Sequence, residues 1–131
     1  MSDATEREHV FGGLDAITID CGDGLELARF WAEVLGTEIE SAVGDGPQYV
    51  DLLPVPGVPI LRFQRVPELK VVKNRVHLDV AVSDLEIAAA RIEALGGRRI
   101  SQEPFAEYHY RWLVMADPEG NEFCVVIRED G

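Results

Sequence analysis

Residues 75–97, RVHLDVAVSDLEIAAARIEALGG, decide the fold because their hydrophobic period changes halfway along the stretch. Up to Asp84, apolar residues alternate with others, which is typical of a half-buried strand. From Leu85 onward the apolar residues recur at helical spacing, Ser83 or Asp84 can cap the first turn, and Gly96 suits the C-terminal end. The stretch therefore predicts a strand that leads directly into an amphipathic helix lying on a sheet.

The same pattern occurs earlier in the chain, in LDAITIDCGDGLELARFWAEVLG at residues 14–36. Residues 25–36 and 85–96 are identical at six of twelve positions with a constant offset of 60, and the preceding strands are offset by 61, with Gly24 as the extra residue. Asp23 and Gly36 occupy the corresponding cap positions. Similarity at a fixed offset indicates a duplicated structural unit.

Three shorter strands are predicted after each helix. Their ranges are 37–43, 48–53 and 60–66 in the first half, and 98–103, 109–116 and 122–128 in the second. PVPGVP and DPEGN punctuate the last turn of each half, and PELKVVKN at 67–74 is the linker. We expect one α+β domain over 1–131, made of two tandem βαβββ modules at about 10–66 and about 75–130.

This arrangement resembles the vicinal oxygen chelate superfamily, which includes glyoxalase I, extradiol dioxygenases and bleomycin-resistance proteins. The resemblance is carried by VHLDVAVSDLE (76–86) and DPEGNEFCVV (117–126), and more narrowly by LRFQRVPE, KNRVHLDV and MADPEGNEFCV, which are similar to glyoxalase-like proteins. It implies a glyoxalase-like fold in which curved mixed sheets form a cup with the site inside. It also implies a homodimer, in which modules can be swapped between chains.

The charge balance narrows the classes of partner. The chain carries 24 acidic and 12 basic residues, a formal charge of -12, which repels nucleic acid and anionic lipid surfaces. Neither a signal peptide nor a membrane-spanning run of apolar residues is recognisable, so we expect a cytoplasmic protein with a small-molecule ligand. Cys21 and Cys124 form no CxxC pair, which suits a reducing compartment.

Strand parity predicts which side chains face the cup, because side chains alternate between the two faces of a sheet. The inward residues of the second module are His77, Asp79 and Ala81 on its first strand and Glu122, Cys124 and Val126 on its last. Those of the first module are Ala16, Thr18 and Asp20, with Arg62 and Gln64 on its last strand. Cys21 and Cys124 then lie on opposite faces, which argues against a disulfide.

The resemblance also implies where a metal would bind. Metal-dependent members place one ligand on the first and one on the last strand of each module, and these positions are Ala16, Gln64, His77 and Cys124 in this chain. Alanine cannot ligate and an amide is a poor ligand. We therefore expect no metal cofactor. A divalent metal, if one binds, would use His77, Cys124 and Gln64, with Glu122 or Asp79 as reserve donors.

The residues admit several roles for the candidate site. His77 can be a structural histidine bonded to Gln64 or a carbonyl, a polar group that orients a ligand, or a general base, since histidine titrates near neutral pH. Trp112 can be a core residue or a ligand platform, because parity does not fix its face. Arg62, if buried, needs an anion, which a ligand carboxylate or phosphate would supply.

Two functions follow from these alternatives. In the first, the cup binds and transforms a small organic metabolite, with Arg62 and Gln64 orienting it and His77 moving a proton, as a lyase, isomerase or dioxygenase-type enzyme would. Asp79, Cys124 and Trp112 would complete the substrate-binding set. In the second, the cup sequesters a small apolar or cationic molecule without changing it, as bleomycin-resistance proteins do. The sequence does not assign the reaction.

Overall fold

The computed structural model describes residues 10–129, which form two modules of the predicted βαβββ type. The first contains β1 (Ala16–Cys21), α2 (Gly24–Leu35), β2 (Ile39–Val43), β3 (Tyr49–Leu52) and β4 (Ile60–Arg65). The second contains β5 (Asp79–Ala81), α3 (Leu85–Ala94), β6 (Arg98–Arg99), β7 (Phe105–Glu107), β8 (Tyr110–Ala116) and β9 (Glu122–Arg128). The α+β fold class is thus confirmed. The predicted domain range of 1–131 extends beyond the described residues.

Both helices begin and end where the sequence predicts. The carboxylate of Asp23 accepts the Glu26 N–H at 3.1 Å, and that of Asp84 accepts the Ile87 N–H at 2.9 Å. Each bond satisfies one of the free N–H groups of a first helical turn. Gly36 ends α2 with a φ of 69°, a left-handed conformation that costs glycine little.

The two sheets repeat one topology and remain separate. Their strand orders are β1-β4-β3-β2 and β5-β9-β8-β6, and β7 pairs with β8 as an addition to the second sheet. The first strand of each module runs parallel to the last, and the remaining pairs are antiparallel. Among the described strands β1 and β5 are therefore edge strands, and the sheets do not close into one cup within a single chain.

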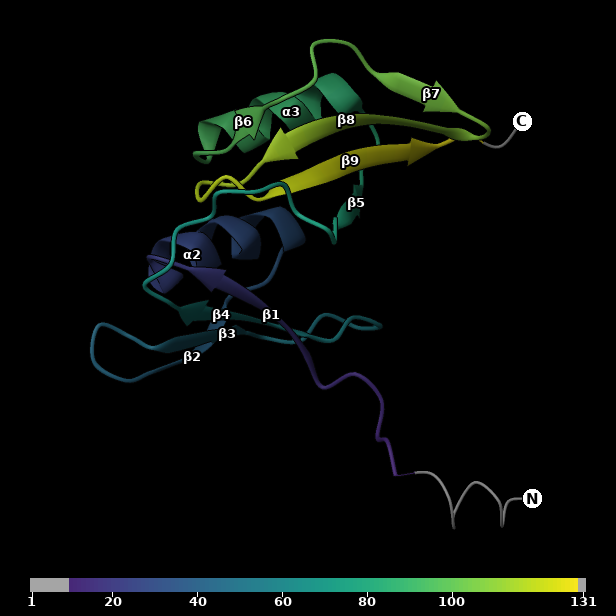
Figure 1. Cartoon of the computed structure of the whole chain (residues 1–131). Coiled ribbons are helices and arrows are strands. Elements are labelled where there is room, and N and C mark those ends of the chain that lie inside the picture. The colour runs from purple at the N-terminus through teal and green to yellow at the C-terminus, as the bar shows by residue number, and fades with distance from the viewer. Residues whose placement is uncertain (1–9, 130–131) are drawn as a thin grey trace, which may run out of the picture.

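One hydrophobic core joins the modules. In Figure 1 the first module lies below the second, and α2 lies between its own sheet and β9. Trp31 on α2 packs against Phe123 on β9 with ring centroids 4.7 Å apart, and Phe30 lies 6.0 Å from the same ring. Phe63, Leu113 and the other buried residues of the helix-covered faces belong to the same cluster. We call the helix-free face of each sheet its open face.

Three strands of the second module differ from the prediction. The first, expected from the alternation that begins at residue 75, contains only Asp79–Ala81 as β5, so His77 precedes the strand that was predicted to carry it. The predicted strand 98–103 is only Arg98–Arg99 as β6, because Ile100 N and Ser101 N both donate to the Val114 carbonyl and the ladder ends there. Proline at 104 has no N–H to extend the pairing. The chain pairs with β8 again as β7, a strand that the sequence did not predict.

Candidate functional site

The open face of the second sheet gathers most of the predicted site residues. The strand register sets Ala81, Val126, Trp112 and Phe105 in one row across β5, β9, β8 and β7. The neighbouring row contains Asp79, Cys124 and Val114. Directly paired residues point to the same face of a sheet. The open face therefore has a floor of small side chains between an aromatic edge and a carboxylate edge.

Trp112 lies on this open face, which resolves the alternative left by parity. Its ring stacks on Phe105 with centroids 5.6 Å apart and an interplanar angle of 24°. Tyr110 is the next open-face residue along β8, and the guanidinium carbon of Arg128 lies 5.8 Å from its ring centroid. The buried core tryptophan is Trp31 instead.

Cys124 occupies the floor of the open face as a free, buried thiol. Burial raises its pKa, and the charge of Asp79 and a hydrogen bond to that carboxylate raise it further. Cys21 lies on the helix-covered face of the first sheet, where burial raises its pKa from 9.0 to about 11. Both thiols are therefore protonated at neutral pH, and neither has the environment of a reactive nucleophile.

His77 lies at the entry to β5 and is exposed. The adjacent Leu78 carbonyl accepts the N–H of Cys124 at 2.9 Å, so the pairing with β9 begins one residue after the histidine. Within residues 10–129, no hydrogen bond links His77 to Gln64. The ligand-orienting and proton-transfer roles of His77 stay predictions.

The open face of the first sheet is polar and internally paired. Arg62 Nε and Nη2 donate to the two carboxylate oxygens of Asp51, which lies opposite on β3, at 2.8 and 3.1 Å. This hydrogen bond and the Asp51 charge raise the pKa of Arg62. The anionic partner that Arg62 was expected to find in a ligand is thus the Asp51 carboxylate of the same sheet. Gln64 lies beside Asp20 of β1 and Tyr49 of β3.

Within a single chain, the four positions that the resemblance implies for a metal do not form a metal-binding site. Ala16 has no donor atom, and Gln64 lies on the first sheet whereas His77 and Cys124 belong to the second. In residues 10–129, no three His, Cys, Asp or Glu side chains lie close enough to bind one ion. We therefore derive no chemistry through a metal.

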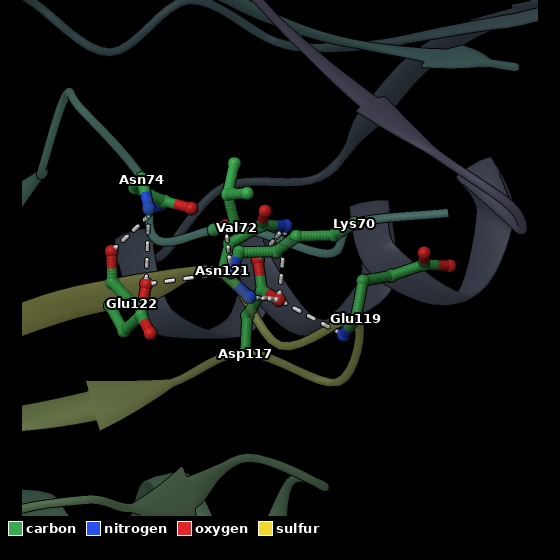
Figure 2. A network of polar contacts seen from close by, with 7 residues as sticks. All are labelled: Lys70, Val72, Asn74, Asp117, Glu119, Asn121 and Glu122. Carbon is green, nitrogen blue, oxygen red and sulfur yellow. Dashed lines mark hydrogen bonds and ion pairs between the residues drawn. The ribbon is translucent and has the colours of Figure 1, made fainter. Parts of the chain in front are cut away.

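A polar loop between β8 and β9 joins the two modules. Figure 2 shows Asp117 bonded to the backbone of Glu119 and to Asn121. Asp117 is buried and also accepts the indole N–H of Trp31 from the first module at 3.0 Å. The Glu119 carboxylate accepts the N–H groups of Gly22 and Asp23 at 3.0 Å each, just before α2. The DPEGN motif therefore holds the first module against the second.

The linker is attached to the same region. Figure 2 shows Asn74 against Glu122, whose backbone carbonyl accepts the Asn74 side-chain N–H at 3.2 Å, and Lys70 lies 3.7 Å from the Glu122 carboxylate. Burial acts to raise the pKa of Glu122, but the Asn74 N–H and the charges of Lys70 and Lys73 lower it overall. The linker is therefore attached to β9 at this point. The sequence did not predict that Asp117 and Glu119 bond to the first module or that Phe105 stacks on Trp112.

A groove lies on the helix side of the molecule and reaches Ala81 at the edge of β5. It has a volume of about 740 Å³ and runs between α2 and α3 along the edge of β5. Its apolar lining includes Val34 and Ile87, and Glu33, Asp84 and Arg91 are among its polar residues. The longer of the two described helices has 12 residues, and no described helix is long and apolar enough to cross a bilayer.

Comparisons with known proteins show which family of proteins this chain is related to. A family model described as a glyoxalase-like domain matches residues 16–126. A hypothetical protein from S. aureus is 16% identical with a TM-score of 0.71, over 94% of this chain and 98% of that chain. The fosfomycin resistance protein FosX from Listeria monocytogenes is 17% identical with a TM-score of 0.69, over 90% and 94%.

A glyoxalase/bleomycin resistance protein/dioxygenase family enzyme from Burkholderia phytofirmans PsJN is 20% identical with a TM-score of 0.68, over 89% of this chain and 99% of that chain. At such identities these structures share the fold, and their different descriptions leave the reaction unassigned. No curated protein matches the chain.

Proposed function

The chain belongs to the glyoxalase-like domain family, and from that premise we propose that it binds a small organic molecule on the open face of its second sheet, without a resident metal ion. The observation that carries this proposal is the register of β5, β9 and β8. It sets Asp79, Cys124 and Trp112 on one exposed face with small residues between them. A few placed polar groups around an apolar floor are typical of a ligand site.

A matched pair of substitutions tests the location. Ala81 is exposed on the open face and Ala90 is exposed on α3, so an arginine at either position has room. Library compounds that raise the melting temperature are expected to stabilise the native protein and Ala90→Arg, but not Ala81→Arg. Differential scanning fluorimetry measures this effect. Ile87→Arg, in the groove between the helices, is expected to keep it. Because Ala81 also lines that groove, stabilisation lost with Ile87→Arg, whether or not Ala81→Arg loses it too, would place the ligand there instead.

The same screen separates binding from reaction. Mass spectrometry of each stabilising compound after incubation shows whether it is recovered intact, as a sequestering protein requires. His77 is the candidate base for a compound that is converted, because it is exposed and lies two residues before Asp79 of the open face. Turnover that His77→Ala retains in full would exclude this role. Stoichiometric metal in protein purified without chelator, found by elemental analysis, would contradict the metal-free proposal.

We further propose a cytoplasmic homodimer that completes the cup. Apolar side chains before β1 and in the linker are largely exposed in one chain, and Figure 1 shows the segment before β1 extending away from the sheets. They are Val10, Phe11, Leu14, Leu69, Val71, Val72 and Val76. Exposed apolar clusters of this kind mark association surfaces. The two free thiols suit the reducing cytoplasm.

Light scattering is expected to give about twice the 14.5 kDa mass of one chain. The double variant Val71→Glu with Val72→Glu should shift the mass toward a single chain, because each charge would lie on the exposed apolar linker. Ala90→Glu with Ala94→Glu, at two exposed positions of α3, is the charge-matched control. A native protein of single-chain mass at micromolar concentration would contradict the dimer.

A further inference from the structure

The second sheet carries an aromatic strip that has no equivalent in the first. It consists of Phe105, Trp112 and Tyr110 on the open face of β7 and β8. β7 is the strand by which the second module departs from the repeat, and in Figure 1 it runs alongside β8 at the outer end of the module. The strip is therefore a local addition to the duplicated fold.

The aromatic strip remains accessible in the folded chain. Phe105 is 49% and Tyr110 is 43% exposed, whereas the core ring of Trp31 is only 1% exposed. At the tip of the same hairpin, Tyr108 has a φ of 58° and is 93% exposed. A non-glycine residue at positive φ is unusual and gains nothing here from burial. The hairpin thus leaves the rings of Phe105, Tyr108 and Tyr110 accessible from solvent.

The opposite edge of the open face carries the exposed carboxylate of Asp79, which accepts a hydrogen bond from the Cys124 thiol, and the charge of Lys73 acts on the same thiol. Glu122 pairs with Lys70 and Asp51 pairs with Arg62, but in residues 10–129 no cation is paired with Asp79. Asp79 also lies in a chain of net charge -12, which favours the approach of cations. Two strand spacings separate β5 from β8, roughly 10 Å, which is comparable to the length of three fused aromatic rings.

We propose that the ligand is a planar aromatic molecule with a positive charge, stacked on Trp112 with its charged group toward Asp79. This inference rests on the proposed function and specifies its ligand. Trp112 supplies the ring face for stacking, and its contact with Phe105 holds that ring in place. Cys124, Val126 and Ala81 form a floor without bulky side chains, so a flat molecule can lie across it.

Proflavine, a planar tricyclic cation, is the probe. Its fluorescence anisotropy on titration with native protein is expected to show saturable binding, accompanied by quenching of Trp112. Trp112→Ala should weaken binding at least about tenfold and Trp112→Phe by less than about threefold, because stacking needs an aromatic face. Asp79→Asn should weaken it about fivefold, whereas Glu93→Gln, which removes the same charge from an exposed position on α3, should not.

Tyr49→Ala is the aromatic control, because Tyr49 is exposed on the open face of the first sheet. Equal losses for Tyr49→Ala and Trp112→Ala would overturn the assignment. The assignment would also be overturned by library compounds that Ala81→Arg no longer binds but that Ile87→Arg and Trp112→Ala bind normally. That result would leave binding at the second sheet intact, because Ile87 lines the groove between the helices. A change of mass in light scattering with Trp112→Ala would show that a second copy covers the aromatic strip, which also contradicts the proposal.

Discussion

Asp117→Ala is expected to destabilise the folded chain by about 3–5 kcal/mol, because it removes the only buried charged side chain of the described residues together with all its contacts. The carboxylate accepts two backbone N–H groups of its own loop and the side-chain amide of Asn121. It also accepts the indole N–H of Trp31, which would remain buried without a partner. Urea denaturation followed by circular dichroism measures the loss.

Asp117→Asn is the matched control. It preserves the volume and one acceptor oxygen, so a smaller loss of about 1–2 kcal/mol is expected. Trp31 emission should shift to longer wavelength in the alanine variant, since its indole lies beside the vacated carboxylate. An alanine variant within about 1 kcal/mol of the native protein would show that the polar loop does not hold the modules together.

The repeat explains how much of the fold could be predicted. Each strand-to-helix stretch carries local signals, the alternation before Asp23 or Asp84 and the caps themselves, that act within a few residues. β6 and β7 lacked such signals. Their boundary depends on two N–H groups that share the Val114 carbonyl across the sheet, a tertiary detail that alternation does not encode.

The sequence predicted which face of each sheet carries the candidate site residues, but not which side chains pair with one another. Parity placed Arg62, Gln64, Asp79 and Cys124 on the open faces, because a period of two follows from strand geometry. It could not reveal that Asp51 neutralises Arg62, since that pairing depends on the β3–β4 register. The family's metal pattern predicted positions on both sheets, which one chain does not bring into contact within residues 10–129.

The module junction explains why the two open faces remain apart. The helix-covered faces share the core, with α2 placed between its own sheet and β9. Glu119 holds the start of α2 by two backbone N–H groups, and the linker is bonded to Glu122. The homodimer proposed above is compatible with this geometry.

Phe123→Ala is expected to cost about 3–5 kcal/mol and to loosen the contact between the modules. The ring is 1% exposed and packs edge-on against both Trp31 and Phe30, so its removal leaves a cavity between α2 and β9. Phe123→Leu refills most of the volume and should cost less than half as much. Phe105→Ala, which truncates an exposed ring, should change the stability by less than about 1 kcal/mol.

Two tryptophans allow the coupling of the modules to be measured in the same experiment. Trp31 of α2 lies at the junction of the modules and Trp112 lies on the open face of the second, so Trp112→Phe isolates the signal of the junction. In the native core, Trp31 emission and circular dichroism of the whole chain should change at one urea concentration, since a shared core unfolds as a unit. Phe123→Ala should lower this midpoint and separate the two transitions. If both probes keep the native midpoint, the modules are stabilised independently and Phe123 does not join them.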